Sequence, residues 1–359
     1  MDKDVEKGWF RMFCSEEEVD RILQPKNAYD YLLSKRAEII ADHARYTRVF
    51  RRKAMLSDNW SLEKSFKKNH YKDYLISLPV VDSERCQSIA YGDMFTNEVN
   101  GFAESNKTWG RIIYLNESLP FFMKFCNLAI FDFGNQVPHY VKKNTLRIAA
   151  RIILKSEAMD FSLDPRGILP AHIMNKIINP IKFEMQFIAG HEFAHHLCNH
   201  FDNTNVSKQS FLTIGENDYS AHIYTPSQKN EFEADIDSIM RPRYNGKEYS
   251  KIYEAAIIWF LSLDIADAIQ EVTNPIPAYK KSHPNAVDRI KNIVENTKKP
   301  KNLNAKMLSR IQSNTEKMKE FLMEDLSLYM DDYEKYGSIY FDKPNTEWRG
   351  AELVDRVDY

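Results

Sequence analysis

Two histidines flank a glutamate and two apolar residues in the segment His191-Glu192-Phe193-Ala194-His195. In a helix, residues four apart lie on the same face, so His191 and His195 can direct a ring nitrogen at one metal ion. Zinc accepts such nitrogens at about 2.1 Å. Glu192 lies about 100° further round the helix, where it can reach a water molecule rather than the metal. The segment therefore predicts a site for one zinc ion, with Glu192 as general base in a hydrolysis.

A catalytic zinc ion needs a third protein ligand. The metzincin pattern HExxHxxGxxH is excluded, because Cys198 and Phe201 stand where it requires glycine and histidine. Downstream, Glu231 and Asp235 are four apart in a segment that we expect to be helical. We expect Glu231 to bind zinc and Asp235 to accept a hydrogen bond from the free ring N–H of a ligating histidine. Glu233 lies on the opposite side of this helix and is the less favoured ligand.

The segment His283-Pro284-Asn285-Ala286-Val287-Asp288-Arg289 has two interpretations. A histidine followed by proline can begin a helix with no functional reason. Alternatively, His283 and Arg289 place hydrogen-bonding or cationic groups where the tetrahedral oxyanion of peptide hydrolysis forms. The residues alone leave both interpretations open, so His283 and Arg289 are candidate catalytic residues.

The elements that must position these side chains are expected to be mostly helical, with one small sheet. The segment Arg111 to Leu115 is rich in β-branched and aromatic residues and predicts a strand. Apolar spacing and helix-breaking residues predict helices over residues 16–23, 27–50, 180 through 195, 228–241, 249–272 and 303–336. The expected fold class is α+β, mostly helical, with a zincin-like catalytic core and a sheet whose edge strand borders the active-site helix.

The chain has 359 residues, of which 43% are hydrophobic and 28% charged, a balance typical of globular proteins. We expect an N-terminal helical extension over residues 1–85 and a zincin-like metallopeptidase domain over 86–300, with an insert at about 116–180. A C-terminal helical segment with an acidic tail is expected over 301–359. The insert is the expected gate of the activity.

A net charge of -2 does not favour nucleic acid as a partner. Four widely spaced cysteines without a CxxC pair fit a reducing compartment. The sequence shows no secretory signal and no apolar run of membrane-spanning length. We therefore expect a cytoplasmic protein that acts on a protein or peptide. The sequence gives no indication of its oligomeric state.

Together these motifs resemble the gluzincin peptidases, and more narrowly the family that contains the HtpX heat-shock protease, the CAAX prenyl protease and their soluble relatives. That family shows HExxHxxxxH, ExxxD and HPxxxxRI in this order, after an Asn-x-Phe-Ala strand entry. The matching residues are His191, His195 and His200; Glu231 and Asp235; His283, Pro284, Arg289 and Ile290; and Asn100, Gly101, Phe102 and Ala103.

The resemblance implies zinc binding by His191, His195 and Glu231, with Glu192 as base and Asp235 beside a ligand. It implies that His283 and Arg289 lie near the oxyanion. It also implies that a peptide substrate pairs with an edge strand at residues 100–103, by β-augmentation. The chain departs from the family in two ways. About 75 residues separate this strand from the zinc helix, and the membrane helices of the better-known members are absent.

The leading hypothesis is a soluble zinc endopeptidase. One alternative is a zinc-stabilised regulatory or binding protein without activity, which the intact Glu192 disfavours. Another is a peptidase-like regulator of the ImmA type, although the first hundred residues contain no convincing helix-turn-helix. The chain is also similar in general plan to the phage-exclusion protease Lit, which implies a host-defence protease with one specific protein target.

Overall fold

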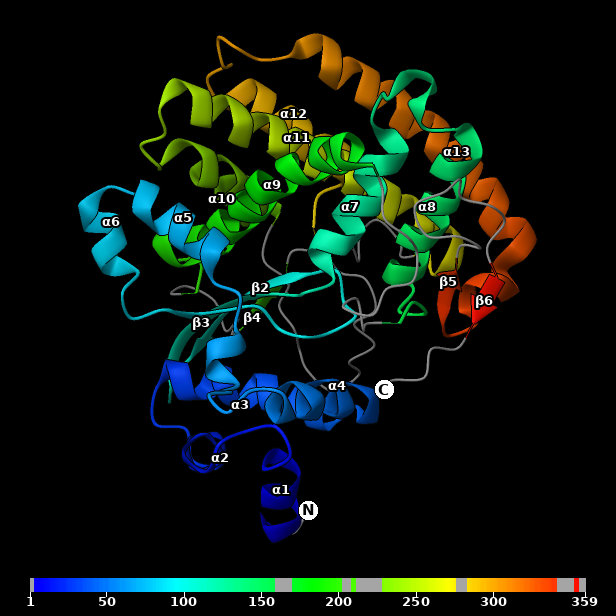
Figure 1. The fold of residues 1–359 in the computed structure, drawn as a ribbon. Helices are drawn as coiled ribbons and strands as arrows, with labels where there is room; N and C mark the ends of the chain where they lie inside the picture. Colours follow the sequence, from blue (N-terminus) through cyan, green and yellow to red (C-terminus); the bar gives the residue numbers. More distant parts are fainter. Residues whose placement is uncertain are drawn as a thin grey trace.

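The computed structural model describes residues 3–158, 170–201, 208–210, 228–275, 283–340 and 352–354. Helices dominate this part of the chain, and a small mixed sheet lies among them (Figure 1). The α+β, mostly helical class expected from the sequence is confirmed. Among the helices described, none is both long and apolar enough to cross a membrane.

The small sheet has the strand order β1-β3-β2-β4. Strands β2 and β3 form an antiparallel hairpin, while β1 runs parallel to β3. Gly110 begins β3 with φ 108°, in the left-handed region that glycine adopts without strain. The strands are β1 (Ala90–Tyr91), β2 (Gly101–Asn106), β3 (Gly110–Leu115) and β4 (Lys208–Ser210).

The prediction that residues 100–103 form a free edge strand is wrong. Strand β4 pairs antiparallel with β2, with Phe102 opposite Ser210 and Ala103 opposite Gln209. An unpaired strand edge exposes backbone N–H and C=O groups, and here the three residues of β4 pair with residues 102–104 of that edge. The backbone groups that were expected to receive a substrate at Phe102 and Ala103 are therefore used within the chain.

The two faces of the sheet pack against different helices. Phe102 and Tyr114 on one face join a hydrophobic core formed with the N-terminal helices. Ala103 and Ile113 on the other face join the larger core. This division follows from the alternation of side chains along a strand. Figure 1 shows the sheet between the blue N-terminal helices and the green helix α9 (Ala171–Leu197).

The N-terminal helices divide between these two cores. The helix expected over 27–50 is two helices that break at Asp42 and His43, where His43 has extended backbone angles. Helix α5 instead places Tyr71 and Tyr74 in the larger core, so residues 1–85 do not form one separate packing unit. The helices are α1 (Lys3–Phe10), α2 (Glu16–Leu23), α3 (Ala28–Ala41), α4 (Ala44–Met55), α5 (Asn69–Ser77) and α6 (Val80–Arg85).

Two long helices, α9 (Ala171–Leu197) and α11 (Gly246–Thr273), form the centre of the larger core. Helix α9 begins at Ala171 rather than near Pro180, which lies inside it. Pro180 has no N–H to donate to the carbonyl of the preceding turn, so the helix loses one backbone bond there. Burial of Ile177 and Ile181 on either side favours the helix despite that loss.

The expected insert at 116–180 contains helices α7 (Leu119–Ile130) and α8 (His139–Ile153). Phe122, Cys126 and Ile148 in these helices are fully buried in the larger core. This burial argues against the expectation that the insert is a movable gate, although residues 159–169 lie outside the described part. The remaining elements are α10 (Gln228–Met240), α12 (Ala286–Asn296), α13 (Ala305–Glu334), β5 (Ser338–Tyr340) and β6 (Glu352–Val354).

Candidate metal centre

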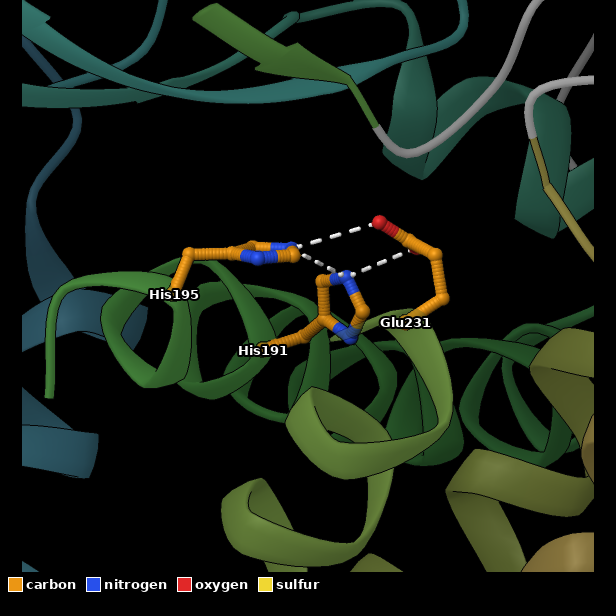
Figure 2. A group of neighbouring side chains, drawn as sticks. All are labelled: His191, His195 and Glu231. Carbon is orange, nitrogen blue, oxygen red and sulfur yellow. Dashed lines mark hydrogen bonds and ion pairs between the residues drawn. The ribbon is translucent and has the colours of Figure 1, made fainter. Parts of the chain in front are cut away.

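Helices α9 and α10 bring the three expected ligands together in the interior (Figure 2). His191 Nε2 lies 3.0 Å from His195 Nε2. Glu231 approaches both rings, with Oε2 at 3.3 Å from His191 Nε2 and Oε1 at 3.5 Å from His195 Nε2. All three side chains are at most 1% exposed. The predicted ligand set is therefore present as a compact, buried group.

The spacing of these atoms fits a tetrahedral zinc ion. Ligand atoms about 2.05 Å from zinc at tetrahedral angles lie about 3.3 Å from one another. The two histidine nitrogens are 3.0 Å apart, and the distances from each to a Glu231 oxygen, Oε2 for His191 and Oε1 for His195, are 3.3 and 3.5 Å, all close to that value. Two imidazole nitrogens and one carboxylate are also a ligand set that catalytic zinc ions use, with a fourth position left for water or substrate.

Asp235, one helical turn after Glu231, lies behind the ligands as the sequence predicted. Its Oδ1 is 2.9 Å from His191 Nδ1, the ring nitrogen that does not face the other ligands. A proton on Nδ1 donates to this carboxylate and leaves Nε2 free to bind a metal. Asp235 therefore fixes both the tautomer and the orientation of the His191 ring.

Arg289 anchors Asp235 rather than projecting into open space. Its Nε and Nη2 donate to the two oxygens of Asp235 at 2.8 and 2.6 Å, and the side chain is 1% exposed. Nη2 also lies 3.5 Å from Glu231 Oε2. His283 approaches the same oxygen through Nδ1 at 3.2 Å. Both residues therefore reach the site, where each approaches a carboxylate, and their oxyanion role stays a prediction.

The side chain of Glu192 extends from α9 toward Gly101 at the start of β2. A Cβ built on Gly101 would come within 2.9 Å of Glu192 Oε1, so the glycine leaves room for this carboxylate. Both carboxylate oxygens are buried, and within the described part of the chain neither has a hydrogen-bond partner. Burial raises the pKa of Glu192 to about 8, and the charge of Glu231 adds to this effect, while His191 and Arg289 oppose it. A buried carboxylate without a partner is costly, which is typical of a functional group.

The electrostatics of the ligand group favour a cation. Burial holds the pKa of His195 well below its usual range. Burial also lowers the pKa of His191, but hydrogen bonds to Asp235 and Glu231 outweigh it and raise the pKa to about 9. When His191 is neutral, as a metal ligand must be, the buried carboxylates of Glu231 and Asp235 face the buried guanidinium of Arg289, and a metal ion among the ligand atoms would offset the remaining negative charge.

The histidine segment of α9 is held in place by residues that the sequence did not single out. Tyr74 of α5 stacks on Phe193 at 5.6 Å between ring centroids. A Cβ at Gly190 would lie 2.5 Å from the Tyr74 ring, so this glycine permits the close packing. Arg85 Nη2 donates to Leu197 O at 2.9 Å and thereby satisfies a terminal carbonyl of α9. No local pattern indicates these contacts, because their partners are distant in sequence.

His200 and Glu233 also join the site. The sequence included His200 only in the HExxHxxxxH spacing, and it set Glu233 aside. His200 Nδ1 lies 2.9 Å from His195 Nδ1, and Glu233 Oε2 lies 3.5 Å from His200 Nε2.

Comparison of the chain with protein-family models, with curated proteins and with solved structures found no match.

Proposed function

We propose that this protein is a zinc-dependent endopeptidase. The observation that carries the proposal is a buried cluster in which His191 Nε2 and His195 Nε2 lie 3.0 Å apart and the Glu231 carboxylate approaches them through Oε2 at 3.3 Å and Oε1 at 3.5 Å respectively. The likeness of its motifs to the gluzincins supports the same reading. A zinc ion bound there would lower the pKa of a water molecule and polarise a peptide carbonyl.

The chain's own residues supply the proton transfer. Glu192 lies next to the ligand His191 in α9 and is fully buried. Within the described residues, neither oxygen of its carboxylate has a hydrogen-bond partner. A carboxylate with a raised pKa is a stronger base than an exposed one, and catalytic acids and bases work best with a pKa near the working pH. Glu192 takes a proton from water as the water attacks the carbonyl carbon, and then gives it to the leaving amine.

An unpartnered base distinguishes this proposal from a purely structural zinc site. A structural site is closed by four protein ligands and has no need of a carboxylate without partners beside it. The substrate is proposed to be a protein or peptide segment in extended form. Because β4 already pairs with β2 at Phe102 and Ala103, such a segment would have to displace β4 or pair elsewhere on the sheet.

The proposal is tested by comparing Glu192→Gln with Glu184→Gln. Both residues are fully buried glutamates of α9 with a pKa raised to about 8 by burial, but Glu184 contacts Asn127 instead of the site. Cells that express native or variant protein are compared for new protein N-termini, and each purified protein is assayed for bound zinc. Removal of a general base should lower cleavage by about 10²–10⁴-fold, with zinc retained.

Three results would count against the proposal. Native protein that binds no zinc would refute the metal site. New N-termini that persist with Glu192→Gln would refute the role of the base. Equal loss of cleavage in Glu184→Gln would show that the effect comes from disturbing α9 and not from the chemistry.

A further inference from the structure

The end of α9 returns the chain so that His200 meets His195. Asn199 has φ 58°, the left-handed conformation that often follows the last residues of a helix. The N–H of His200 donates to His195 O at 3.0 Å, and the N–H of Asn199 donates to His196 O at 3.3 Å. These two bonds define the Schellman motif, in which the residue two beyond the cap packs on the residue three before it.

In Schellman motifs that contact is frequently between two apolar side chains. Here it joins two imidazole rings, with His195 Nδ1 at 2.9 Å from His200 Nδ1. His200 is itself buried, and its Nε2 faces Glu233 Oε2 at 3.5 Å. The three side chains therefore form a chain of contacts that runs from the ligand His195 outward to Glu233, whose side chain is 54% exposed.

The protons in this chain of contacts follow from metal binding at His195. A neutral imidazole that binds zinc through Nε2 must carry its proton on Nδ1. That proton can be donated only if His200 Nδ1 is an acceptor, which places the His200 proton on Nε2. From there it is donated toward Glu233. Asp235 performs the corresponding task directly for His191.

We infer that His200 is a positioning residue for the metal site: it accepts the hydrogen bond of His195 Nδ1–H, fixes that tautomer and ring orientation, and is itself oriented by Glu233. This inference rests on the proposed zinc site. It assigns a physical reason to the histidine five residues after His195, since the Schellman geometry brings those two side chains together. Both ligand histidines then have a partner on the ring nitrogen that faces away from the metal.

The same residues could be read as a second metal site. Cys198, His200 and Glu233 offer ligand atoms that all lie within 4.8 Å of one another. A metal on His200 Nε2 would force the His200 proton onto Nδ1, where it would face the proton of His195 at 2.9 Å. Two donors cannot satisfy one another, so metal at the second set would weaken metal binding at the first. The positioning role is therefore the assignment compatible with a loaded site.

The test measures zinc affinity by competition with a chromophoric chelator and zinc stoichiometry by native mass spectrometry. His200→Ala removes the acceptor, and loss of such a partner should weaken zinc binding by about 10–100-fold. His200→Asn places Oδ1 where Nδ1 stood and should keep the affinity within a few-fold of native. Glu233→Gln should cause a smaller loss than His200→Ala. Cys198→Ser and His172→Ala, an exposed position of α9, are the matched controls and should match native.

The ligand field gives a readout independent of activity. The visible spectrum of Co²⁺-substituted protein should change in His200→Ala and return toward native in His200→Asn. Equal affinity in native protein, His200→Ala and His172→Ala would overturn the inference while leaving the proposed zinc site intact. Two zinc ions in native protein and one in Cys198→Ser or His200→Asn would overturn it in favour of the second metal site. Absence of zinc from native protein would refute the proposed function, and the inference with it.

Discussion

Replacing Glu184 with glutamine should stabilise the protein in a manner that depends on pH. Glu184 is fully buried in α9, and its Oε1 accepts a hydrogen bond of 3.1 Å from Asn127 Nδ2. Burial raises its pKa from 4.5 to about 8, although the Asn127 bond opposes the shift. The folded protein therefore keeps a proton on Glu184 at pH values where the unfolded chain has released it.

The sign and size of the effect follow from this difference. As pH rises from about 4.5 to about 8, the unfolded state sheds a proton that the folded state retains, so each pH unit disfavours folding by about 1.4 kcal/mol. Summed from pH 4.5 to pH 7, Glu184 lowers the free energy of unfolding of the native protein by at most about 3 kcal/mol. Glutamine keeps an acceptor for Asn127 and does not titrate. If the glutamine N–H groups lack an acceptor, they lower the stability of the variant by about 1–3 kcal/mol at every pH. The diagnostic quantity is therefore how the difference in unfolding free energy between the two proteins changes with pH.

The assay is urea unfolding of native protein and Glu184→Gln at pH 5, 6, 7 and 8, each with excess chelator. In the difference in unfolding free energy between the two proteins, the contributions of all other titrating groups cancel. We expect this difference to shift in favour of the variant by about 1 kcal/mol or more per pH unit up to about pH 8. A difference that does not change with pH would refute the reasoning, because it would mean that Glu184 titrates normally in the folded protein.

Three further predictions concern the metal centre. Gly101→Ala should lower kcat/KM while zinc affinity stays near native, because its Cβ would meet Glu192 Oε1 at 2.9 Å and Leu115 Cδ2 at 2.6 Å; a parallel fall in zinc affinity would contradict this. Asp235→Asn should weaken zinc binding by about 10–100-fold in the chelator competition assay, since the His191 tautomer loses its acceptor; an unchanged affinity would show that His191 is oriented otherwise. Zinc at 100 times its dissociation constant should stabilise native protein by about 2.7 kcal/mol in thermal unfolding, and His191→Ala should show no such gain; an equal gain in both would place the zinc elsewhere.

Much of the site could be predicted because its residues are neighbours within single helices. His191 and His195 share a face of α9, and Glu231 and Asp235 share a face of α10, each through the four-residue spacing that helix geometry imposes. Side-chain type then restricts the chemistry, since imidazole and carboxylate are zinc ligands. The helices that carry the four residues were likewise indicated by local apolar spacing.

The tertiary structure decided how these local pieces meet. It placed α10 beside α9 so that the Glu231 carboxylate approaches both histidine rings, and it turned Arg289 toward Asp235. It paired β4 with β2 and so occupied an edge that the sequence left open. Pairings of this kind depend on backbone groups and on contacts between segments far apart in the chain, and neither leaves a periodic signal in side-chain type.

The sequence by itself determined which imidazole and carboxylate groups are proposed as ligands and base and how they are spaced, because one helical turn fixes the relation of residues four apart. Whether His191, His195 and Glu231 could share one ion was decided only when burial of α9 and α10 against a common core fixed the two helices against each other. The same packing removed water from Glu192, which raises its pKa to about 8. A residue's chemistry is local, but its solvation and partners belong to the folded chain.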